Sequence, residues 1–164
     1  MSTAYHATVF LHVLSAIVWL GGMIAFALLA PILRGVGDEG ARQGLFQGLG
    51  ERFRIVGWLC LSTLMVTGLV QMYARGWWGA GVLGSARFWG TPVGAALAWK
   101  LVVVAAMLGV QAVHDFWMGP RAGRVRPGTT EARALRRRAA ILARVNAVLA
   151  PVLVWFAVAL ARGG

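Results

Sequence analysis

The chain has little charge, and very little negative charge. Only 13% of its 164 residues are charged and only five are Asp or Glu, whereas a soluble domain has about 25% charged residues. The sequence contains no paired carboxylates, nucleophile elbow, phosphate-binding loop or zinc-ligand spacing. These absences argue against soluble-type catalysis and against metal-assisted hydrolysis.

Cysteine is nearly absent as well. The single Cys60 lies in an apolar run and excludes an intramolecular disulfide, so we interpret it as a small buried hydrophobic residue. No internal repeat, low-complexity segment or second domain is recognisable. We therefore expect one domain over residues 1–164.

Apolar residues are abundant: 59% of the chain is hydrophobic and the mean hydropathy is +0.72. Four apolar runs are each long enough to cross a hydrocarbon core of about 30 Å. They predict membrane helices over Ala7–Leu33, Ile55–Ala74, Pro92–Met118 and Ala140–Ala161. The predicted fold is an all-α, integral-membrane, up-and-down four-helix bundle. Pro92 suits a first helical turn, and Pro151 should kink the last helix unless neighbours satisfy the freed carbonyl.

The formal net charge is +11, but so apolar a chain does not suggest a nucleic-acid partner. The arginines divide by connection, and the first and third connections hold most of them: Arg34, Arg42, Arg52, Arg54, Arg121, Arg124, Arg126, Arg133, Arg136, Arg137, Arg138 and Arg144. The second connection and the C-terminus hold only Arg75, Arg87 and Arg162. The positive-inside rule then predicts a prokaryotic inner-membrane protein with both termini outside and the Arg-rich loops facing anionic cytoplasmic headgroups. Residues 129–144 read as a helical extension of the last span, with Thr130 as a possible cap.

Two ionisable residues, His12 and Lys100, lie inside apolar runs. Such residues are functional-site candidates because they are costly at membrane depth. Their helices should run in the same direction and place both in the outer third of the bilayer. Thr67 and Gln71 share a helix face, and Gln71 should lie level with them. We therefore predict one outer site built from three helices.

His12 suggests an axial heme ligand or a copper ligand, and the alternative is a hydrogen bond to Ser15 or Gln71. Lys100 could bind a carboxylate or a heme propionate, or it could shuttle protons. Its alternative is snorkelling to the outer headgroups. His6, six residues before His12, could cap the site from above.

His114 lies 14 residues after Lys100, about 21 Å along a helix. It cannot share one metal with His12, so two sites follow if both bind something. With Asp115 it could form an orienting pair or a proton relay, or an interfacial pair on the Arg-rich loop. Asn146 and Arg144 could reach this end, or only solvate the end of their helix.

Five methionines are spread over all depths, without a tight cluster: Met23, Met65, Met72, Met107 and Met118. Most are expected to pack in the core. A copper site would use His6, His12 and a methionine such as Met72.

Several short motifs resemble one superfamily. The stretch from His12 through Trp19 to Gly22 resembles the first helix of copper-resistance-D (CopD) proteins and of the HemJ type of protoporphyrinogen oxidase. Further stretches continue the resemblance: Arg52–Arg54, Trp99–Leu101, His114–Arg121, and Arg144–Asn146 with Pro151. Ala147 stands where HemJ proteins usually have Glu, and the overall pattern is closer to short CopD-like proteins.

The HemJ resemblance implies heme b with His12 as axial ligand and Lys100 as its functional partner, and places Trp19 in the same motif. The CopD resemblance implies copper uptake or tolerance. We predict a heme-b-binding membrane protein with a redox role and a pocket lined by Lys100, Gln71, Thr67 and Trp19. As an enzyme it would be a heme-dependent oxidoreductase, with a redox partner or quinone and possible homodimerisation. The alternative is a copper-handling protein with His12, His6 or His114 as ligands.

Overall fold

The computed structural model describes residues 3–125 and 129–163, so the predicted loop residue Arg126 lies outside the described part. Within it every element is helical and no strand occurs. Four helices are long and apolar enough to span a membrane: Thr3–Arg34, Glu39–Ala74, Pro92–Arg121 and Thr130–Ala161. The predicted all-α membrane fold is confirmed.

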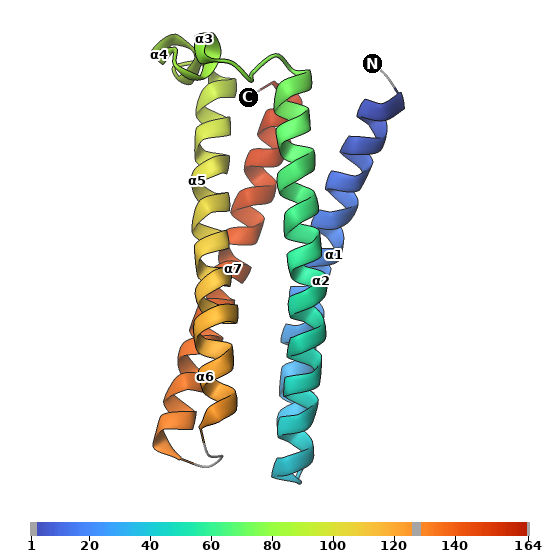
Figure 1. Ribbon diagram of the computed structural model, residues 1–164, viewed down its shortest axis with the longest axis vertical. Helices are drawn as coiled ribbons and strands as arrows, with labels where there is room; N and C mark the ends of the chain where they lie inside the picture. The colour runs from blue at the N-terminus through green and yellow to red at the C-terminus, as the bar shows by residue number, and fades with distance from the viewer. Residues whose placement is uncertain (1–2, 126–128, 164) are drawn as a thin grey trace. The chain divides into compact units, whose positions relative to one another are not determined.

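The chain forms two compact units, Met1–Val82 and Leu83–Gly164. The single domain predicted over residues 1–164 stays a prediction. Each unit is built on a pair of long helices with opposite directions (Figure 1).

The first unit is a helical hairpin of α1 (Thr3–Arg34) and α2 (Glu39–Ala74). Glycines on both helices allow the close approach. A Cβ at Gly22 would overlap the ring of Phe53, and a Cβ at Gly57 would lie 3.8 Å from the indole of Trp19. Small residues at such crossings let membrane helices gain van der Waals contact.

Helix α2 begins much earlier than the predicted residue 55, which corrects the sequence-based boundary. Asp38 caps it, since its side chain accepts hydrogen bonds from the backbone N–H groups of Gly40 and Ala41. Glu39 in the first turn also suits the positive end of the helix dipole. The length of an apolar run indicates only the membrane-embedded part of a helix, so it does not predict the polar first turns of α2.

Two short helices lie in the predicted loop. Helix α3 (Ala80–Leu83) ends at the first residue of the second unit, and α4 (Ala86–Trp89) lies within that unit. Helix α5 (Pro92–Ala112) follows, with Pro92 in its first turn as predicted. Thr91 caps it by accepting from the Gly94 N–H at 3.0 Å. A Cβ at Gly94 would overlap the carbonyl oxygen of Phe88, so this turn requires glycine.

The predicted third helix changes its winding near its end. After α5 the chain forms a π-helix, η1 (Val113–Met118), and then α6 (Gly119–Arg124). Single π-turns inside helices occur frequently at functional sites. The η1 turn contains His114 and Asp115.

Helix α7 (Thr130–Arg162) confirms the helical extension of the last span. Its cap is Thr129, one residue before the predicted Thr130; the Thr129 hydroxyl accepts from the Ala132 N–H at 3.2 Å. The helix continues through Pro151.

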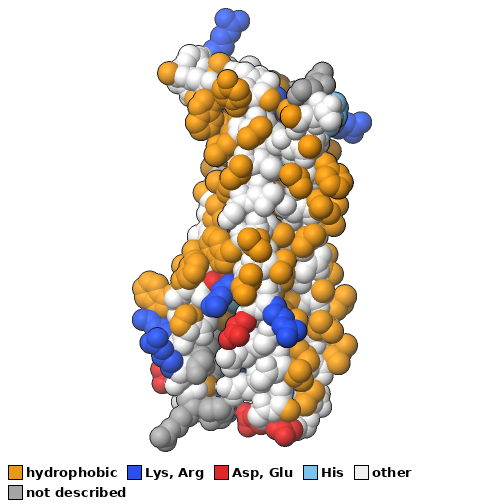
Figure 2. All heavy atoms as spheres, turned by 45° about the vertical axis from the view of Figure 1, so that its right-hand side comes forward, with side chains coloured by type: hydrophobic (Ala, Val, Ile, Leu, Met, Phe, Trp, Pro, Cys, Tyr) orange, Lys and Arg blue, Asp and Glu red, His pale blue; other side chains and the backbone are white. Residues whose placement is uncertain are grey.

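Large apolar side chains cover the surface (Figure 2). Ile32 is 69% exposed on α1, Leu59 64% on α2, and Trp155 72% on α7. Soluble monomers rarely expose apolar surface on this scale. The four apolar helices and this surface identify an integral membrane protein.

Candidate functional site

His12 lies on α1 and contacts α2 through its ring. Its Nδ1 is 2.8 Å from Thr67 Oγ1, and a Cβ at Gly68 would lie 3.6 Å from its Cε1. Thr67 is buried and His12 half-buried. Thr67, a member of the predicted polar face, is therefore a hydrogen-bond partner of His12, where the sequence suggested Ser15 or Gln71.

The hydrogen bonds of Thr67 determine which nitrogen of His12 carries the proton. The Thr67 hydroxyl is 2.6 Å from the Thr63 carbonyl oxygen and 3.3 Å from that of Leu64. A hydroxyl has one hydrogen, which is donated to Thr63. Thr67 Oγ1 must then accept from His12 Nδ1–H, and in the neutral imidazole Nε2 carries the lone pair. This is the arrangement that metal-ligating histidines use.

Gln71 lies one helical turn beyond Thr67 and is half-buried. Its Nε2 is buried, and in the described part of the chain it has no hydrogen-bond partner. Burying an amide nitrogen unpaired costs free energy. Gln71 is therefore an unpaired donor one turn from the residue that bonds His12, and its part in the predicted site stays a prediction.

Trp19 and His6 lie at other levels of the first unit. Trp19 is 4% exposed and packs on Gly57, seven residues or about 10 Å along the helix from His12. Its indole N–H also lacks a partner among the described residues. His6 is exposed in the first turns of α1, with its ring edge-on to Tyr5 at 6.4 Å. These two residues are not brought to His12 within α1.

Lys100 is half-buried on α5 of the second unit, two turns after Pro92. His12, Thr67 and Gln71 belong to the first unit. The shared site of His12 and Lys100 therefore stays a prediction.

The second unit has a separate polar network around His114. His114 Nδ1 donates to Asp115 Oδ1 at 2.8 Å, and Gln111 Nε2 donates to Asp115 Oδ2 at 2.8 Å. Asn146 of α7 donates from Nδ2 to Gln111 Oε1 at 3.1 Å and to the Met107 carbonyl at 3.4 Å. The predicted reach of Asn146 to the His114 end is confirmed, through Gln111.

Burial makes this network structurally important. Asp115 is 5% and Asn146 3% exposed, whereas the side chain of His114 is 37% exposed. Asn146 Oδ1 lacks a hydrogen-bond partner within the described residues. Arg144 is exposed, and which of its two predicted roles it has stays open.

Sequence reasoning missed Gln111, the link between the two helices. A polar pair four residues apart in an apolar run, Gln111 and Asp115, was the available signal. The π-turn had no comparable signal, because it depends on the tertiary environment.

No group of three or more His, Cys, Asp or Glu residues that could hold a metal ion occurs in the described ranges. Zinc sites need at least three protein ligands. A zinc-type site is therefore not formed by these residues.

A comparison with known protein families covers most of α2 and nearly all of the chain that follows it. The family model for copper resistance protein D matches residues 47–160. A protein of Aquifex aeolicus (strain VF5), described as uncharacterized, is 34% identical over 115 residues, or 69% of each chain. No solved structure matches.

The family match includes Thr67, Gln71, Lys100 and His114, and it begins after the α1 residues His6, His12 and Trp19. It covers well over half of the chain and includes three of its four apolar spans wholly or in large part. The chain belongs to the copper resistance protein D family.

Proposed function

We propose that this membrane protein handles copper and that His12 Nε2 is a copper ligand. Family membership supports the copper chemistry. The observation that carries the residue assignment is the bond from His12 Nδ1–H to Thr67. It orients the ring and leaves the lone pair on Nε2, as ligation requires.

The surroundings favour Cu(I). Soft thioether and imidazole ligands select Cu(I). Met72 is half-buried and one turn beyond Gly68, where an added Cβ would lie 3.6 Å from His12 Cε1. We propose His12 and Met72 as a pair of ligands, with His6 on the outer side as a transfer ligand.

The test is a Cu(I) titration of the metal-free protein against a chromogenic chelator. His12→Ala should weaken binding at least tenfold. Thr67→Val should weaken copper binding about tenfold, because losing a residue that orients a metal-ligating histidine costs less than losing the ligand itself. Thr67→Ser, which keeps the hydroxyl, should restore the binding. Ser15→Ala is the matched control, a hydroxyl loss on α1. Equal copper binding by wild type and His12→Ala would refute the assignment.

The same preparations separate copper from heme b. The Nε2 lone pair of His12 would also ligate heme iron, so the predicted redox protein remains the alternative. A Soret band in wild type that disappears in His12→Ala would favour heme. Colourless protein from heme-sufficient cells with stoichiometric copper would exclude it.

We also propose His114 as a separate metal contact. Asp115 holds its Nδ1–H, the carboxylate–histidine arrangement of many metal sites. If both histidines act, wild type should bind two copper ions and His114→Ala one. One ion in both proteins would leave His114 with a structural role only.

The orientation predicted from the arginines is part of this proposal, with both termini outside and the Arg-rich ends in the cytoplasm. In a Cys60→Ser background, a cysteine placed at Ser2 should react with an impermeant maleimide on intact cells. A cysteine placed at Arg137 should react only after lysis. The reverse pattern would invert the topology.

A further inference from the structure

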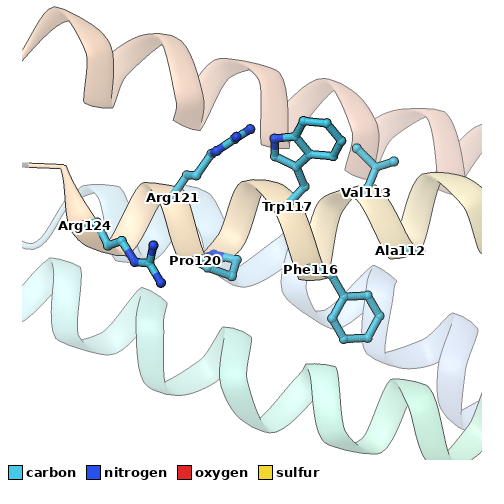
Figure 3. A pocket seen from close by; sticks show the side chains of 7 residues that line it. All are labelled: Ala112, Val113, Phe116, Trp117, Pro120, Arg121 and Arg124. Carbon is cyan, nitrogen blue, oxygen red and sulfur yellow. The ribbon is translucent and has the colours of Figure 1, made fainter.

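A hollow of about 530 Å³ lies on the second unit where η1 joins α6 (Figure 3). Its volume lies within the roughly 300–1,000 Å³ of small-molecule pockets. Two side-chain rows spaced by four residues line most of it: Phe116, Pro120 and Arg124, and Val113, Trp117 and Arg121.

The lining changes from apolar to basic along the helix. Val113 lies at one end and Arg124 at the other, with Phe116 and Trp117 between them (Figure 3). Phe116 is 65% and Trp117 58% exposed. The membrane span that contains α5 ends at Arg121. A bilayer covering this span would place the apolar end of the hollow in the hydrocarbon region and its basic end at the headgroup level, where Trp and Arg are favoured.

Arg121 and Arg124 form the basic end of the hollow. The Arg121 guanidinium carbon lies 4.8 Å from the centre of the Trp117 ring, a cation–π contact that holds the cation beside the hollow. Among the described residues that line the hollow, none is acidic. The neighbouring Asp115 is buried and accepts hydrogen bonds from Gln111 and His114.

We propose that this hollow binds one anionic phospholipid. Its phosphate lies between Arg121 and Arg124, and an acyl chain runs along Phe116 and Val113. The order of basic, aromatic and aliphatic residues matches the order of headgroup, glycerol and chain in a standing lipid. An inorganic anion or an acidic peptide would leave the apolar half uncovered. The proposal does not depend on copper binding.

The test is native mass spectrometry of the delipidated full chain with phosphatidylglycerol and with phosphatidylcholine of the same acyl chains. One phosphatidylglycerol should bind more tightly than phosphatidylcholine. The double variant Arg121→Gln/Arg124→Gln should weaken its binding about thirtyfold, as expected for two basic side chains at an anionic surface. Phe116→Ala should weaken it about fivefold through lost apolar contact.

The matched control is Arg137→Gln/Arg138→Gln, which removes the same charge from exposed positions of α7. It should change the affinity less than twofold. An equal loss in both double variants would reduce the effect to general electrostatics and overturn the site. Equal binding of phosphatidylcholine, or displacement of the lipid by millimolar inorganic phosphate, would overturn it as well.

Discussion

The two helical units place polar groups in apolar surroundings in different ways. In the first unit, His12 of α1 is hydrogen-bonded to Thr67 of α2, and glycines allow the two helices to approach closely. In the second, Asn146 is linked through Gln111 and Asp115 to His114, with two nearly fully buried members. A network of buried hydrogen bonds fixes the geometry of its members, because each lost bond leaves a buried polar group unpaired. The second unit is therefore expected to lose more stability than the first when one polar member is removed.

Gly94→Ala should give the largest effect and test the rigidity of the second unit. The new Cβ would overlap the Phe88 carbonyl oxygen, and backbone cannot rotate away. We expect a loss of about 3 kcal/mol in the free energy of unfolding, measured by circular dichroism in detergent. Gly109→Ala, with open space around its Cβ, is the control. A loss below about 1 kcal/mol would show that this turn can move.

Asn146→Ala should lower the free energy of unfolding by about 2 kcal/mol, because Gln111 Oε1 and the Met107 carbonyl lose a buried donor. Unfolding in denaturant measures it. Gln47→Ala, which removes an exposed amide bonded to Glu51, should change stability by less than about 0.5 kcal/mol. Equal effects of the two substitutions would contradict the importance of burial in this network.

Gly22→Ala tests the first unit and should cost about 1 to 2 kcal/mol. Its Cβ would meet the Phe53 ring, a side chain that can rotate at some cost. The reactivity of Cys60, which is the single cysteine and is buried, reports unfolding of this unit. Gly21→Ala, with nothing nearby, should leave the thiol protected as in wild type. If Gly22→Ala lowered the free energy of unfolding as much as Gly94→Ala, overlap with a side chain would cost as much as overlap with backbone, which would contradict the expected difference.

Thr67→Val should have the smallest effect on stability, about 0.5 to 1 kcal/mol. It should still change the chemistry of His12, because Nδ1 loses its acceptor and the Nε2–H tautomer becomes populated. Nitrogen-15 spectra of labelled histidine measure the tautomer. An unchanged spectrum would show that Thr67 does not select it.

Much of the fold was predictable from the sequence. Length and hydrophobicity define four spans, since only helices of about 20 apolar residues satisfy the backbone in lipid. The helical extension before residue 140 was predicted as well. The early start of α2 was not, because its first turns are polar and depend on the Asp38 cap.

The candidate sites were predicted in part. His12 and the Thr67 face follow from one polar residue in an apolar run and a spacing of four. The sequence did not predict the Gln111 link, the π-turn or the hollow at Trp117 and Arg121, since each depends on how the helices pack.

The sequence by itself determined that this is an all-helical membrane protein with a histidine in its first span and an Arg-rich end. These properties depend on local hydrophobicity and charge. Only the tertiary structure decided that Thr67 orients His12, that Asn146 completes the His114 network, and that η1 replaces a regular turn. Hydrogen bonds between helices require distances and directions, and linear spacing does not contain them.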